Sequence, residues 1–214
     1  DHDGTTLAWF VMVYGFVAAI LPVWMLLAPR DYLSTFLKLG TVVLLAVAIL
    51  IMRPELKMPA LTQFVDGSGP VFSGALFPFV FITIACGAIS GFHALIASGT
   101  TPKLLQSEGD VRLIGYGAML LESFVAIMAM IAATLLDPGV YFAINSPLAA
   151  LGGTPEAAVA TLSTWGFPVD IERMNALAHQ VGEATLFART GGAPSLAVGM
   201  ASVFAGVFGQ HLLA

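Results

Sequence analysis

The 214-residue chain is 58% hydrophobic and only 10% charged, and its mean hydropathy is +0.91. So much apolar surface exceeds what a soluble domain of this length can bury, which places the chain in a membrane. The formal charge of −5 and the eight scattered Lys and Arg leave no basic stripe for phosphates, so nucleic-acid partners are excluded. The single cysteine and four histidines have no metal-ligand spacing, and we predict no metal and no cofactor.

Four apolar segments are predicted to cross the bilayer within residues 1–136, because roughly 20 helical residues span a hydrocarbon core of about 30 Å. They cover residues 7–28, 35–52, 75–97 and 113–136. Pro22 is expected to kink the first span. The short link 29–34 should make the first two spans antiparallel neighbours, with Arg30 and Asp31 either pairing in water or gating a pathway. Residues 53–74 are rich in Pro and Gly and predict a loop, with a short interfacial helix around 59–64 as an option.

The third span has the most unusual sequence, FPFVFITIACGAISGFHALIASGTTP over residues 77–102. Its small residues recur at helical steps and leave one face where a backbone or a solute can approach closely. His93 places an ionisable group within this span, where anchoring does not require one. We therefore predict that this segment receives substrate, with candidate binding residues Gly87, Ser90, Gly91, Ser98, Thr100 and Thr101.

Glu122 lies near the middle of the fourth span. A bare carboxylate at that depth costs about 2.5–3.5 kcal/mol on insertion scales, so it should be protonated, paired or facing water. Such a group is suited to carrying protons. The alternative is a neutral Glu that hydrogen-bonds a neighbouring helix and only fixes packing.

Residues 137–192 are predicted to lie outside the membrane, either as a cap over a pathway or as a solvated connector. Within them, 155–165 and 170–188 have helical spacing, and Asp170 is a plausible N-cap. Residues 193–214 predict a fifth span with small residues at close-packing steps. The expected fold is therefore all-α, a polytopic transmembrane bundle of about five spans.

Several long segments carry a family resemblance: PRDYLSTFLK (29–38), GPVFSGALFPFVFITIACGAISGFHALIASGTTPK (69–103), IGYGAMLLESFVAIMA (114–129) and RTGGAPSLAVGMA (189–201). They closely resemble the carbon starvation protein A family of bacterial membrane proteins. The resemblance implies a multi-pass secondary transporter of the inner membrane that serves peptide uptake when carbon is scarce. Some members are similar to pyruvate:proton symporters. The family is placed in the amino acid–polyamine–organocation superfamily, which implies a LeuT-like pair of inverted repeats.

The chain departs from this family in length. Members have several hundred residues and carry an earlier His- and Gly-rich segment that is not found here, so we expect the chain to be part of a longer transporter. By analogy with inverted-repeat transporters, the earlier segment and residues 86–98 would be two broken helices facing each other across the site. The remaining segments of the same transporter are then its partners, together with the lipid bilayer.

The leading hypothesis is a proton-coupled importer of small carboxylate-bearing nutrients, peptides or pyruvate. Backbone N–H groups near residues 87–91 would meet the carboxylate, and His93 and Glu122 would handle protons. Sodium is an alternative coupling ion, since Thr83, Ser90 and Ser98 offer oxygen ligands. A membrane nutrient sensor without transport is the alternative function. An enzyme is not expected, because no catalytic constellation is apparent.

Overall fold

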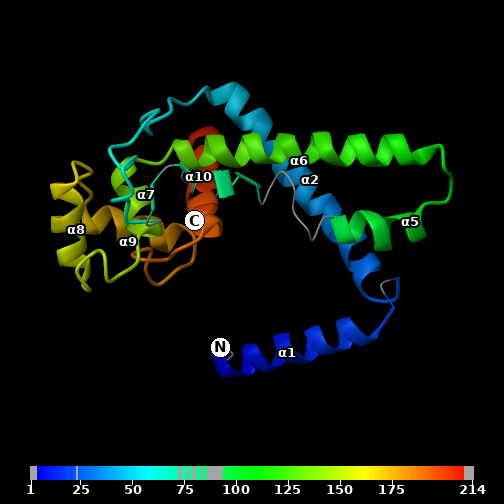
Figure 1. Cartoon of the computed structure of the whole chain (residues 1–214). Helices are drawn as coiled ribbons and strands as arrows, with labels where there is room; N and C mark the ends of the chain where they lie inside the picture. Colours follow the sequence, from blue (N-terminus) through cyan, green and yellow to red (C-terminus); the bar gives the residue numbers. More distant parts are fainter. Residues whose placement is uncertain are drawn as a thin grey trace. The chain divides into compact units, whose positions relative to one another are not determined.

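A computed structural model describes residues 4–22, 24–71, 74–75, 77–78, 81–82, 84–85 and 94–209 (Figure 1). This described part of the chain consists of helices joined by turns, bends and irregular segments, and it contains no strand. The predicted all-α class is thus confirmed for these residues. The chain divides into two compact units, Asp1–Val47 and Ala48–Ala214.

The first unit holds α1 (Gly4–Ile20) and most of α2 (Leu27–Met52). The predicted link at 29–34 is wrong, because these residues lie in the first turns of α2 and the chain instead leaves the helix between Ile20 and Leu27. Pro22 explains the position of the break, since proline disfavours a helical conformation at the preceding residue, Leu21. Pro29 is tolerated where it lies, because N–H groups in a first helical turn have no partner within the helix.

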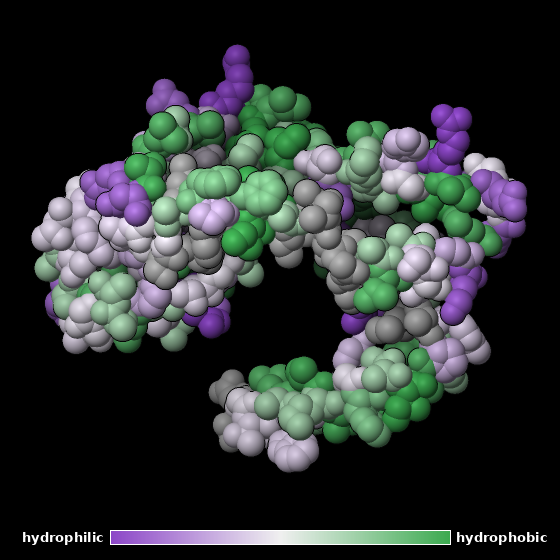
Figure 2. All heavy atoms as spheres, viewed as in Figure 1, coloured by the Kyte–Doolittle hydropathy of each residue, from purple (hydrophilic) through white to green (hydrophobic). Residues whose placement is uncertain are grey.

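Two of the described helices, α2 and α6 (Asp110–Thr134), are long and apolar enough to cross a membrane. Two shorter apolar helices are α1 and α10 (Gly192–Phe208). No residue of α1 is buried, and Figure 2 shows hydrophobic residues along it, whereas paler and purple residues gather over α8 and α9. Exposed apolar helices of this kind require apolar surroundings, which a bilayer or further helices provide.

The loop that follows α2 attaches to the end of α6. The backbone N–H groups of Lys57 and Met58 donate to the Thr134 carbonyl oxygen at 2.9 and 3.1 Å. These bonds satisfy one of the carbonyls that the last turn of a helix leaves unpaired. Residues 53–71 contain no helix, so the short helix suggested around 59–64 is absent.

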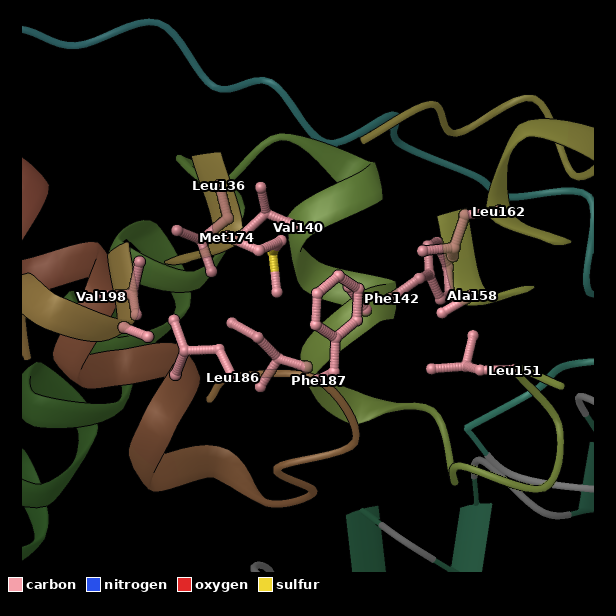
Figure 3. Packing of buried hydrophobic residues seen from close by; sticks show 13 residues of the cluster. Leu136, Val140, Phe142, Leu151, Ala158, Leu162, Met174, Leu186, Phe187 and Val198 are labelled. Carbon is pink, nitrogen blue, oxygen red and sulfur yellow. The ribbon is translucent and has the colours of Figure 1, made fainter. Parts of the chain in front are cut away.

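Three short helices form a small hydrophobic core: α7 (Pro138–Asn145), α8 (Pro155–Thr164) and α9 (Ile171–Gln180). Figure 3 shows side chains from these helices converging with Leu186, Phe187 and Val198. The Phe142 ring stacks on Phe167 with 4.8 Å between centroids, and Phe64 of the preceding loop meets its edge at 5.3 Å. The core therefore joins the loop after α2 to the segment between α6 and α10.

Residues close in sequence determine where α8 begins and where α9 begins and ends. Thr154 accepts a hydrogen bond from the Ala157 amide at 3.2 Å and caps α8. The predicted N-cap at Asp170 is confirmed, since its carboxylate accepts from the Glu172 amide at 3.4 Å. The helix expected to reach residue 188 ends at Gln180, because Gly182 has a φ of +72°, which favours glycine and stops the helix.

We predict that Phe142→Ala destabilises this core by about 3–5 kcal/mol, because it removes a buried ring and leaves a cavity. Phe142 is only 5% exposed, whereas Leu148, which is 44% exposed, provides a control. Hydrogen exchange of the amides of α7 to α9 measures the change in opening free energy. Equal effects of Phe142→Ala and Leu148→Ala would contradict the assignment of this core.

The helix α10 packs closely on its neighbours at two glycines. A Cβ atom at Gly199 would overlap the Ala132 carbonyl group of α6, and one at Gly206 would overlap the Met52 side chain. Ser195, Val198 and Val203 on the same helix are buried. The small residues predicted along this segment thus allow close helix approach at Gly199 and Gly206.

Candidate functional site

The described part of the predicted substrate segment is an irregular helix. Residues 96–100 form the π-helix η1 (Ile96–Thr100), which α5 (Thr101–Leu104) continues directly. The Thr101 amide reaches back to the Ile96 carbonyl oxygen. Pro102 has no N–H to offer the Ser98 carbonyl, which favours this wider turn. Turns of this type occur frequently at functional sites.

Three of the predicted binding residues lie in this irregular turn. Ser98 is exposed and its hydroxyl donates to the Leu95 carbonyl oxygen at 3.3 Å, while Thr100 and Thr101 are half-buried. The other three, Gly87, Ser90 and Gly91, lie outside the described residues, as does His93. The substrate-binding and proton-coupling assignments remain predictions.

Glu122 lies in the middle of α6 on an exposed part of the helix. Its carboxylate makes no hydrogen bond or ion pair with any residue that the structure describes, whereas the adjacent Ser123 hydroxyl bonds the Met119 carbonyl oxygen at 3.0 Å. The side chains around it on α6, Leu121 and Val125 among them, are apolar and exposed. A carboxylate on so apolar a helix is suited to proton exchange or to a polar partner from another segment.

Arg30 and Asp31, the proposed gating pair, contact each other in the first unit. The guanidinium Nη2 lies 2.7 Å from the Asp31 Oδ1, and its Nη1 donates to the Tyr14 hydroxyl at 2.9 Å. Both charged side chains are more than half exposed, so the pair contributes little stability in water. The pairing anticipated from the sequence is confirmed, whereas gating remains a prediction.

A second charged group was not anticipated from the sequence. Asp137 follows α6 and receives two cations: its Oδ1 lies 3.0 Å from the Lys57 Nζ, and its Oδ2 contacts the Arg173 Nη2. Lys57 comes from the loop after α2 and Arg173 from α9. The only available signal in the sequence was an acid directly after an apolar run and directly before a proline, which does not identify its partners.

A third charged group, the ion pair of Arg189 with Glu183, stabilises the turn that leads into α10. Arg189 donates to both carboxylate oxygens of Glu183, at 2.8 and 3.2 Å. The hydrogen bonds from Arg189 hold the pKa of the Glu183 carboxyl below its ordinary value. A lowered folded pKa contributes stability that is complete above the unfolded pKa and is lost as the pH falls through the folded value.

We therefore predict that the turn 183–189 opens more readily as the pH falls below about 4, near the ordinary Glu range. Hydrogen exchange of its amides, corrected for intrinsic rates between pH 6 and pH 3, measures this change. Glu183→Gln should open the turn at every pH and abolish the dependence. Identical exchange in wild type and Glu183→Gln at pH 6 would contradict the pair's role.

Two helices whose length and composition suit a membrane span, together with many exposed apolar side chains, are typical of a helical membrane protein. The family model for "Carbon starvation protein CstA" matches residues 1–214. The chain therefore belongs to the CstA family, as the sequence motifs predicted.

Characterised relatives share much of the sequence. The chain is 62% identical to the peptide transporter CstA of Escherichia coli K12 over 98% of its length, and 55% identical to the pyruvate/proton symporter BtsT of the same organism over 94%. It is 50% identical to the peptide transporter CstA of Bacillus subtilis 168 over 98%. It covers 30%, 31% and 33% of these relatives, respectively, about a third of their length. No solved structure matches the chain.

Proposed function

We propose that the full-length protein is a secondary active transporter that imports small carboxylate-bearing nutrients, peptides or pyruvate, together with protons. The similarity to relatives named as peptide transporters and as a pyruvate/proton symporter carries this proposal. The transporter would be a multi-pass protein of the bacterial inner membrane, linked to growth under carbon starvation. Within it, this chain supplies about five spans of a LeuT-like inverted-repeat fold.

The substrate carboxylate would bind at the irregular part of the third span. There, Ser98, Thr100 and Thr101 would join Gly87, Ser90 and Gly91, and a break in the helix would leave backbone groups free to contact the substrate. His93 and Glu122 would gain and lose protons as the pathway alternates. Opening and closing would involve the Arg30 and Asp31 pair, whose exposed geometry allows it to break at little cost. The protein has no proposed catalytic role.

Uptake into proteoliposomes containing the full-length protein tests the proposal. Labelled pyruvate and a labelled dipeptide are compared with and without an inward proton gradient. We expect the gradient to raise the accumulation of at least one of them. Binding of either compound without flux would favour the alternative, a membrane nutrient sensor, and accumulation driven only by a sodium gradient would replace the proton as the coupling ion.

A further inference from the structure

The extramembrane core contains a hollow that the proposed transport site does not use. It has a volume of about 600 Å³ and lies between the start of α7 and the start of α9. This volume is within the range of about 300–1,000 Å³ found for small-molecule sites. Its wall includes the apolar residues Phe167, Pro168 and Val169 and the charged residues Asp137, Asp170 and Arg173.

A close backbone contact shapes one wall of this hollow. A Cβ atom at Gly139 would lie 2.8 Å from the Phe167 carbonyl oxygen and would also overlap the Pro168 carbonyl. Glycine at this position therefore lets the segment 166–170 approach the first turn of α7. The rings of Phe167 and Phe142 stack behind it and anchor the segment in the core.

Arg173 lines the hollow and retains hydrogen-bonding capacity. Its Nη2 contacts Asp137, but its Nε and Nη1 donate to no residue that the structure describes. Lys57 shares the same carboxylate at 3.0 Å, so the two cations and Asp137 together carry one excess positive charge. Because its Nε and Nη1 have no partner among the described residues, the guanidinium can donate hydrogen bonds to a second carboxylate.

Asp170 supplies the opposite charge on the same wall. Its Oδ1 accepts the capping bond from the Glu172 amide, whereas its Oδ2 accepts no hydrogen bond from the described residues. Asp170 and Arg173 stand three residues apart at the start of α9, on neighbouring positions of one face, yet no ion pair joins them. The lining of the hollow thus combines a positive group, Arg173, and a negative group, Asp170, with the apolar residues 167–169.

We propose that this hollow binds short peptides with free termini, the carboxylate on Arg173 and the ammonium on Asp170. The apolar wall at 167–169 then accommodates the side chains. Pyruvate lacks an ammonium group and would leave Asp170 without a partner, so the site selects peptides. This inference rests on the proposed import of carboxylate-bearing nutrients and adds an extramembrane site that captures one class of them.

Hydrogen exchange of the full-length protein in nanodiscs gives a local test. Dialanine is titrated while protection of the amides of residues 166–173 is followed, and the apparent dissociation constant is compared with that of N-acetyl-dialanine and dialanine amide. We expect dialanine to protect the segment. Blocking either terminus should weaken binding by about twofold to fivefold, the range measured for exposed ion pairs.

Asp170→Asn removes the charge but keeps a good N-cap, so it should weaken dialanine binding by the same factor without unfolding α9. Glu172→Gln is the matched control, because it removes a charge from the same helix end outside the hollow. Equal protection by dialanine and N-acetyl-dialanine, or equal effects of the two variants, would overturn the proposal. Dialanine protection without any flux would instead contradict transport and leave this site intact.

Discussion

Glu122→Gln in the full-length protein is expected to abolish substrate accumulation driven by a pH gradient while leaving counterflow exchange intact. Glutamine keeps the size and hydrogen-bonding capacity of the side chain but cannot release a proton. Exchange of labelled for unlabelled substrate needs no net proton movement, so it should continue at near wild-type rates. Parallel assays in proteoliposomes, one with an imposed pH gradient and one with preloaded substrate, measure the two activities.

Ser123→Ala is the control for this experiment, because Ser123 lies beside Glu122 on α6 and, among the described residues, its hydroxyl bonds only to the Met119 carbonyl of the same helix. It should retain both activities. Equal loss of accumulation and exchange in Glu122→Gln would mean that the carboxylate fixes helix packing. In that case Glu122 would be a neutral side chain that hydrogen-bonds a neighbouring helix and carries no proton.

Gly199→Ala should destabilise the full-length protein by about 1–3 kcal/mol, the usual cost of overpacking. The added methyl group would overlap the Ala132 carbonyl, and a backbone atom cannot move aside without shifting α6 or α10. The apparent melting temperature in detergent measures the effect. We expect a clear decrease, and larger side chains at this position should prevent accumulation of folded protein.

Alanine substitutions at two other glycines of α10 serve as controls for the change in melting temperature. A Cβ atom at Gly192 meets nothing within 4 Å, so Gly192→Ala should leave the melting temperature unchanged. At Gly206 the added atom meets the Met52 side chain, whose flexible thioether can move, so an intermediate effect is expected. A Gly199→Ala protein as stable as wild type would contradict the close packing of α10 on α6.

The sequence predicted apolar segments where α1, α2, α6 and α10 lie, but it did not predict where the helix of the first segment ends. Apolar residues continue from residue 7 to residue 28, a pattern that predicts a kink at Pro22 and a turn at residues 29–34. The chain instead leaves the helix before Pro22 and resumes at Leu27. Hydropathy reports the environment of a segment, whereas the backbone restrictions at Leu21 and Pro22 decide where a helix ends.

The hydrophobic core formed by α7, α8 and α9 was predicted only in part. The N-caps of α8 and α9 depend on local residues, and Asp170 was identified from its position alone. By contrast, the stack of Phe142 on Phe167 and the convergence of Lys57 and Arg173 on Asp137 join residues far apart in the chain. Local periodicity contains no information about such pairings, which follow from how the helices pack.

The candidate transport site was also predicted only in part from local sequence. Small residues and ionisable groups identified the third span and Glu122, because their cost within a bilayer can be judged from the sequence. The π-helix at Ile96–Thr100 was not predicted, although Pro102 provides a local reason for it. The other predicted site residues of this segment, Gly87, Ser90, Gly91 and His93, lie outside the described residues, so their role rests on the sequence argument.

Substrate-driven proton movement tests the central claim most directly. The full-length protein is reconstituted into liposomes that contain a pH-sensitive dye, without an imposed gradient, and pyruvate or a dipeptide is added outside. Proton symport predicts that the lumen acidifies when a transported substrate is added, and that liposomes containing Glu122→Gln do not respond. An unchanged internal pH, despite measurable substrate binding to the wild-type protein, would contradict proton-coupled import.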